Sequence, residues 1–171
     1  MNISSYKIDD KGEQLLELLE NNSRLTPEDL SKILDIPVEQ VNAYIKTFED
    51  DNIIVRYTAQ VNWERIRLEE RVRALIEVKV TPEHGVGFDS IAEHIYRFEE
   101  VKSAILLSGA YDLLVYVEGE SLQQVAFFVS EKLSTIKGVQ SAVTHFRLKT
   151  YKENGQILVS DGESKRLPFS F

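Results

Sequence analysis

The pattern of apolar residues between positions 72 and 149 limits the possible folds more than any other feature of this sequence. Residues 72–80 are apolar at every second position, which is the spacing of a strand with one buried face. A helix and a second strand follow, and the same order begins again at Leu113. The order β-α-β-β-α-β predicts a ferredoxin-like domain, in which a four-stranded antiparallel sheet carries both helices on one face.

The other elements of this domain follow from the same periodicities. We expect strands at residues 101–107, 113–117 and 139–149, and helices over residues 88–98 and 121–136. The second helix should turn five apolar residues inward: Leu122, Val125, Val129, Leu133 and Ile136. Two helices cover only one face, so the other face needs a partner, and a second copy of the chain is the usual solution. We assign to that open face Ala104, Leu106, Ala142 and Phe146.

Residues 9–49 predict three short helices. The first, over residues 9–21, has leucines at helical spacing. The second begins at Thr26-Pro27, with a threonine cap and a proline at the first helical position, and it should bury Ile33. A tight turn at residues 35–37 leads into the third helix. This spacing predicts a helix-turn-helix domain.

The third helix, over residues 38–49, is the expected DNA-contacting element, because the third helix of such a domain lies in the major groove. Gln40 and Asn42 can pair with adenine edges, and Lys46 can meet a phosphate or a guanine. Alternatively, these are solvated polar residues on a small helical bundle, and periodicity leaves both interpretations open. The outward positions that we assign to DNA are Glu39, Gln40, Asn42, Ala43, Lys46 and Thr47.

An extended segment connects the two domains of this predicted α+β protein. A strand should begin at Ile53, and alternate apolar residues up to Trp63 predict a linking strand that pairs with its own copy in another subunit and buries Trp63. In the tail, Asn154-Gly155 predicts a short hairpin. The expected order is helix-turn-helix domain, linking strand, ferredoxin-like domain and tail, at residues 1–54, 55–67, 68–150 and 151–171.

The formal charge is −8 and is concentrated in the first half of the chain. Residues 1–66 hold 7 Lys and Arg against 13 Asp and Glu, a net charge of −6. Nucleic-acid affinity comes largely from neutralising phosphates. DNA binding by this half must therefore overcome an unfavourable field.

Several classes of protein lack support in the sequence. The chain has 0 cysteines, which excludes disulfide scaffolds and thiolate metal sites. No apolar run approaches the ~20 residues of a membrane span and no secretion signal is visible, so we expect a cytoplasmic protein without membrane contact. The 3 histidines lack metal-ligand spacing. Because there is also no phosphate-binding glycine loop and no Ser–His or Cys–His pair, we expect no enzyme, metal or cofactor.

The segment Gly109-Ala-Tyr111-Asp112, between two predicted strands, is the candidate ligand site. A glycine at a strand end lets a ligand or another backbone approach closely. Tyr111 offers a stacking face and a hydroxyl, and Asp112 offers a charge, which together suit a small molecule with an amine. A plainer interpretation is that Asp112 only caps the turn between the strands.

Together these residues resemble the feast/famine transcription regulators, the Lrp/AsnC family. The resemblance covers about residues 8–150, and its most specific parts are Gly109-x-Tyr111-Asp112 and Lys137-Gly138-Val139. It implies a sequence-specific regulator that binds double-stranded DNA and responds to a small effector, typically an amino acid. It also implies homodimers, paired through linking strands and C-terminal sheets, that associate further into octamers.

The resemblance places the effector between the C-terminal domains of neighbouring dimers. Two departures concern DNA: Pro37 stands where the family usually has a capping serine, and Lys46 is the one basic residue in a helix that is often arginine-rich. They favour an alternative, an effector-sensing oligomeric partner protein with little independent DNA binding. The effector residues implied by the resemblance are Gly109, Tyr111, Asp112 and Thr144.

Overall fold

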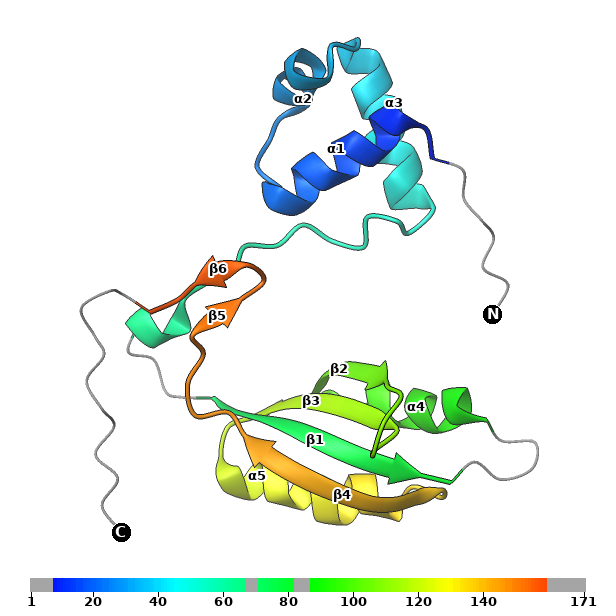
Figure 1. Cartoon of the computed structure of the whole chain (residues 1–171), viewed down its shortest axis with the longest axis vertical. Coiled ribbons are helices and arrows are strands. Elements are labelled where there is room, and N and C mark those ends of the chain that lie inside the picture. The colour runs from blue at the N-terminus through cyan, green and yellow to red at the C-terminus, as the bar shows by residue number, and fades with distance from the viewer. Residues whose placement is uncertain (1–7, 67–70, 82–86, 160–171) are drawn as a thin grey trace. The chain divides into compact units, whose positions relative to one another are not determined.

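The chain folds as two compact units, with the division between Val61 and Asn62. The structure, a computed structural model, describes residues 8–66, 71–81 and 87–159. Figure 1 shows a helical N-terminal unit and a C-terminal unit built on a sheet. The division falls within the segment that we predicted to link two domains.

The N-terminal unit contains three helices, α1 (Asp10–Asn21), α2 (Pro27–Leu34) and α3 (Val38–Asp50). Local interactions fix their ends. Thr26 and Asp29 form a reciprocal capping box at the start of α2, and Asp35 ends it with a left-handed φ of 53°. The helices enclose a core of Leu15, Leu19, Leu30, Leu34, Val41 and Phe48. The predicted helix-turn-helix arrangement is confirmed.

Two details of this unit differ from the prediction. Ile33 is 54% exposed rather than buried, because α2 turns Leu30 and Leu34 toward the core instead. No strand begins at Ile53; its backbone N–H and that of Ile54 both donate to the carbonyl of Phe48 and close the end of α3. These bonds use the amide groups that a strand would have needed.

Over residues 55–66, the part of it that the structure describes, the linking segment forms no strand within a single chain. Residues 55–62 have neither helical nor strand structure, and Trp63–Arg65 form a short 3-10 helix, η1. Trp63 is 49% exposed. Because the predicted strand was to pair with a second copy, pairing of the linking segments remains a prediction, and burial of Trp63 does not occur within one chain.

The C-terminal unit has the predicted ferredoxin-like topology. Strands β1 (Val72–Val80), β2 (Val101–Leu106), β3 (Leu113–Gly119) and β4 (Val139–Phe146) form an antiparallel sheet in the order β2-β3-β1-β4. Helices α4 (Phe88–Tyr96) and α5 (Leu122–Phe127) connect the strands. A π-helical turn, η2 (Phe128–Lys132), and a 3-10 turn, η3 (Leu133–Thr135), complete the second helical segment.

The core of this unit lies between the sheet and its helices. Ala74, Ile76 and Val78 of β1 are fully buried against Ile91 and Ile95 of α4 and against residues of the second helical segment. Leu122, which we expected to face inward, is 58% exposed. Ser121 caps α5 by accepting from the Gln124 N–H, so the first turn of the helix starts at the edge of the core.

Our assignment of the open sheet face was wrong by one residue of register. Ala142 and Phe146 lie opposite Val78 and Ala74, and Ala104 and Leu106 lie opposite Val115 and Leu113. Directly paired residues share a face, and these partners are all buried on the helix side. A shift of one residue moves every side chain of a strand to the other face. Apolar residues on the open face include Leu75, Ile105, Leu114, Tyr116 and Val143.

The predicted terminal hairpin is present. Strands β5 (Lys152–Glu153) and β6 (Gln156–Ile157) pair across Asn154 and Gly155, whose φ angles are 46° and 79°. Two successive positive φ angles are what an Asn-Gly hairpin turn requires. The side chain of Asn62 donates to the carbonyl of Leu158 at 2.7 Å, which attaches the hairpin to the start of the unit.

Gly138 illustrates a position that only glycine fills without strain. Its φ is 95°, and a Cβ there would lie 2.7 Å from Cδ1 of Ile91. We expect Gly138→Ala to lower the free energy of unfolding by about 1–3 kcal/mol, since both strain and overlap oppose it. Urea unfolding checks this, with Gly87→Ala as the control because a Cβ at Gly87 meets no atom of the described residues within 4 Å. Equal losses in both variants would contradict the explanation.

Candidate DNA-binding and effector-binding sites

The six residues that we assigned to DNA all lie on the exposed surface of α3, namely Glu39, Gln40, Asn42, Ala43, Lys46 and Thr47. The same helix buries Val41 and Phe48, so its two faces are clearly divided. Two side chains donate hydrogen bonds to the backbone around the turn before it. Ser31 donates through its hydroxyl to the Ile36 carbonyl at 2.6 Å, and the Lys11 ammonium donates to the Leu34 carbonyl at 2.7 Å.

The start of α3 lacks a side-chain cap. Pro37 occupies the capping position and makes no side-chain hydrogen bond there, as we expected because the proline side chain has no hydrogen-bonding group. Glu39 lies in the first turn, where a carboxylate interacts favourably with the helix dipole. The exposed face of α3 therefore carries one acidic and one basic side chain among the six assigned positions. It offers hydrogen-bonding groups rather than a strong positive field.

A groove of about 420 Å³ runs beside the exposed face of α3, and sequence inspection did not reveal it. Its lining comes from both ends of the helical unit: Ile8, Asp9, Gln40, Ala43, Tyr44, Thr47 and Phe48. The Tyr44 hydroxyl donates to Oδ2 of Asp9 at 2.5 Å. Asp9 and Tyr44 are 35 residues apart, so no local spacing signal identifies the pair.

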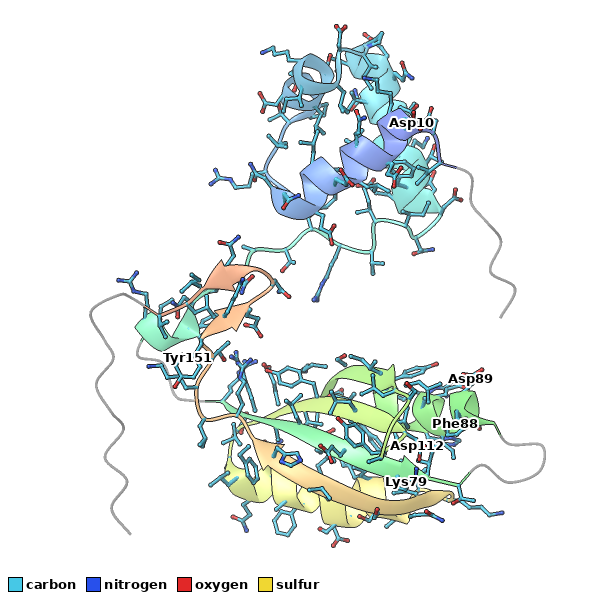
Figure 2. The ribbon with its side chains drawn as sticks, in the orientation of Figure 1. Asp10, Lys79, Phe88, Asp89, Asp112 and Tyr151 are labelled. Carbon is cyan, nitrogen blue, oxygen red and sulfur yellow. The ribbon has the colours of Figure 1, made fainter. Side chains whose placement is uncertain are left out.

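The carboxylate of Asp112 is engaged within its own chain. Oδ2 accepts from the backbone N–H of Val80 at 2.9 Å, and Oδ1 accepts from the Lys79 ammonium at 3.1 Å. The hydrogen bond from the Val80 backbone N–H is the main cause of a lowered pKa of the Asp112 carboxyl, and the Lys79 ammonium lowers this pKa further. Figure 2 shows the two labelled side chains, Lys79 and Asp112, at the same end of the sheet. The structural role, tying the turn to β1, is thus present in the single chain.

The rest of the predicted effector turn is open. Gly109 is exposed, and a Cβ built on it meets no heavy atom within 4 Å. Tyr111 is half-buried. No described residue of the chain therefore fills the space beside Gly109, and such open space is the condition for a ligand or a second copy to approach its backbone.

The structure does not bring Thr144 to this turn within one chain. Thr144 lies on β4 opposite Ile76 of β1, whereas Asp112 precedes Leu113 of β3, which lies opposite Val78. Strand β1 separates β3 from β4. Within one chain, Thr144 and the turn therefore lie on strands that are not neighbours.

The part of the chain that the structure describes contains neither a metal-binding cluster nor a membrane-spanning helix. No group of three or more His, Cys, Asp or Glu side chains there is arranged to hold a metal ion. None of the helices within those residues is long and apolar enough to cross a membrane.

Comparison with known families matches both units. Residues 8–55 match a winged helix-turn-helix DNA-binding domain, and residues 73–157 match the Lrp/AsnC ligand binding domain. The second match includes the β5–β6 hairpin, so it extends past residue 150, where we expected the resemblance to end.

Relatives of this chain match it over nearly its whole length. An HTH-type transcriptional regulator of Bacillus subtilis is 45% identical over 96% of this chain and 99% of its own. One from Pyrococcus horikoshii is 33% identical over 85% of this chain and 96% of its own.

Solved structures agree in fold. A transcriptional regulator of Neisseria meningitidis in complex with L-Met is 26% identical with a TM-score of 0.66, over 89% of this chain and 97% of its own. AsnC of Escherichia coli is 21% identical with a TM-score of 0.65, over 90% and 100%.

Proposed function

Because this chain belongs to the Lrp/AsnC family of transcriptional regulators, we propose that it is a sequence-specific regulator whose oligomer responds to an amino acid. The chain combines a DNA-binding helix-turn-helix with a ligand-binding domain, and its relatives are regulators rather than enzymes. We further propose how α3 contacts DNA, which class of molecule the C-terminal unit binds, and how copies of the chain assemble.

The observation that carries the DNA proposal is the exposed polar row on α3. Glu39, Gln40, Asn42, Ala43, Lys46 and Thr47 are all accessible on the helix that enters the major groove in such domains. Gln40 and Asn42 have the paired donor and acceptor that adenine presents, and Lys46 can neutralise a phosphate. The net charge of −6 over residues 1–66 makes each contact weak. Several linked units on one DNA would compensate through avidity.

We place the effector beside the Gly109–Asp112 turn. An ionised carboxylate has about four acceptor positions, so the bonds from Val80 and Lys79 leave Asp112 able to accept from an ammonium group. The structurally similar Neisseria regulator was solved with L-Met, which favours an amino acid. Gly109 leaves room for the ligand, Tyr111 offers a hydroxyl, and Thr144 would come from another copy.

The assembly that we propose covers surfaces that one chain leaves exposed. On the open face of the sheet, Ile105 is 48% and Val143 51% exposed, and in the linking segment Tyr57 and Trp63 are 46% and 49% exposed. Burying such apolar area against a second copy is favourable. A dimer that pairs through the open sheet face and the linking segment, with dimers joined into octamers, would bury both of these apolar surfaces. Sedimentation of the full chain at the mass of one copy would contradict this part of the proposal.

Binding-site selection from randomised double-stranded DNA, followed by titration with and without single amino acids, tests the function as a whole. We expect one preferred sequence and an affinity for it that changes with at least one amino acid. Salt-independent binding, or binding without sequence preference, would refute the DNA part. An affinity that no amino acid changes would refute the effector part.

Lys46→Glu distinguishes DNA reading by α3 from the alternative of a partner protein with little independent DNA binding. Reversing this charge should weaken DNA binding about tenfold or more and reduce its salt dependence. Lys102→Glu is the control, since it makes the same charge change on β2 of the other unit. Fluorescence anisotropy with labelled DNA measures both. If Lys46→Glu binds like the wild type, α3 does not contact DNA and the acidic helices are better explained as a protein-binding surface.

A further inference from the structure

A chain of hydrogen bonds runs from the start of α1 to the exposed face of α3. The carboxylate of Asp9 accepts the Gly12 N–H at 2.8 Å and the Tyr44 hydroxyl at 2.5 Å. The Tyr44 oxygen in turn accepts from Nε2 of Gln40 at 3.4 Å. Asp9 thus caps α1 and also determines the surroundings of a side chain on α3 that we assign to DNA.

The direction of each bond in this chain is fixed by chemistry. An ionised carboxylate only accepts hydrogen bonds, so the single hydroxyl proton of Tyr44 must go to Asp9. The Tyr44 bond lowers the pKa of Asp9, and the Asp9 carboxylate raises the pKa of Tyr44, so both groups keep these states at neutral pH. The Tyr44 oxygen can then only accept. Gln40 must turn its NH2 group, not its carbonyl, toward Tyr44.

The packing around Tyr44 holds its hydroxyl in place. The ring stacks on Phe48, with centroids 5.9 Å apart and planes inclined by 22°. A Cβ on Gly12 would lie 3.1 Å from both Phe48 Cζ and Asp9 Oδ1 and 3.4 Å from the Tyr44 ring, so the glycine permits the close approach of α1 to α3. If this contact only joined α1 to α3, the hydrogen bond between Asp9 and Tyr44 would be sufficient. Gln40 extends this chain of hydrogen bonds beyond that contact, and its side chain lines the same groove.

We propose that Asp9 and Tyr44 are positioning residues that fix the side-chain amide of Gln40 for recognition of adenine in the major groove. With one N–H held by Tyr44, the Gln40 amide keeps its other N–H and its carbonyl oxygen for the N7 and N6 groups of adenine. A freely rotating amide would present either end, and the preference would weaken. This inference rests on the proposed function, because it requires α3 to read DNA.

Tyr44→Phe tests the proposal most directly, since it removes the hydroxyl and keeps the ring that stacks on Phe48. Each variant of the full chain is measured on the DNA selected by the wild type and on copies with single A·T pairs replaced. We expect Tyr44→Phe to lose about tenfold of its discrimination at one A·T pair, with non-specific affinity unchanged. Gln40→Ala should lose the same discrimination, and the double variant should lose no more.

Two further variants separate positioning from structure. Asp9→Ser keeps a good helix cap but is too short to reach Tyr44, so it should match Tyr44→Phe both in discrimination and in its small loss of melting temperature, because the two variants remove the same hydrogen bond. Tyr96→Phe is the control, because it removes a tyrosine hydroxyl from α4, which belongs to the other unit; it should discriminate like the wild type.

The outcomes are distinct. Unchanged discrimination in folded Tyr44→Phe or Asp9→Ser overturns the positioning role, even if Gln40→Ala loses specificity. Loss at several unrelated base pairs also overturns it, since that would indicate a displaced helix. A wild-type chain without any sequence preference refutes the proposed function itself.

Discussion

Phe48→Ala should unfold the N-terminal unit and abolish DNA binding while the C-terminal unit stays folded. The Phe48 side chain is 1% exposed and lies in the core of that unit. Truncating a buried phenylalanine costs about 3–5 kcal/mol. A unit that ends at Val61 has a total stability of roughly 3–9 kcal/mol at typical values per residue. The loss is thus comparable with everything that keeps the helices folded.

The C-terminal unit should tolerate this change because the two hydrophobic cores share no residue. Calorimetry should show the sheet-based transition at its wild-type temperature and the helical one shifted or absent. Ile33→Ala is the matched control: it also truncates a large apolar side chain of the same unit, but one that is 54% exposed, and should change stability little. Cooperative loss of both transitions in Phe48→Ala would show that the units do not fold independently.

The sequence predicted those elements in which local signals and burial agree. The strict alternation of Val72 to Val80 identified β1, and Thr26-Pro27 identified the start of α2, since in each case the local preference and the core require the same structure. The Asn154-Gly155 turn could be predicted from local preference alone, because both residues tolerate the positive φ angles that such a turn requires. The ferredoxin-like topology followed from the order of these elements.

What sequence inspection missed depends on contacts between distant residues. The face on which Ala142 and Phe146 lie is set by pairing with β1, and the short β4 pattern fits either register. The Asp9–Tyr44 hydrogen bond joins the N-cap residue of α1 to a residue of α3 that is 35 positions away in the sequence. The groove beside Gln40 is lined by both residues of that pair.

Asp112→Asn should remove the response to the effector while preserving the turn. The amide is the same size as the carboxylate and can still accept from the Val80 N–H, but it offers no charge to an ammonium group. Hydrogen bonds to charged groups contribute more than neutral ones, so effector affinity should fall about tenfold or more. Ligand-induced thermal shift measures this, because a ligand stabilises the native state that binds it. Asp35→Asn, the same change on an exposed turn of the other unit, is the control.

The acid stability of the same variant reports the structural role separately. The pKa of Asp112 is lowered in the folded chain, chiefly by the Val80 amide, from an ordinary value of 3.8. A lowered folded-state pKa means that the carboxylate stabilises the fold above pH 3.8 and that this stabilisation is lost as the pH falls further, through the folded-state pKa. Asp112→Asn should therefore lose less stability than the wild type on acidification below pH 3.8. If the variant still responds fully to the effector but shows this flatter acid profile, Asp112 is a turn cap alone and the ammonium must bind elsewhere.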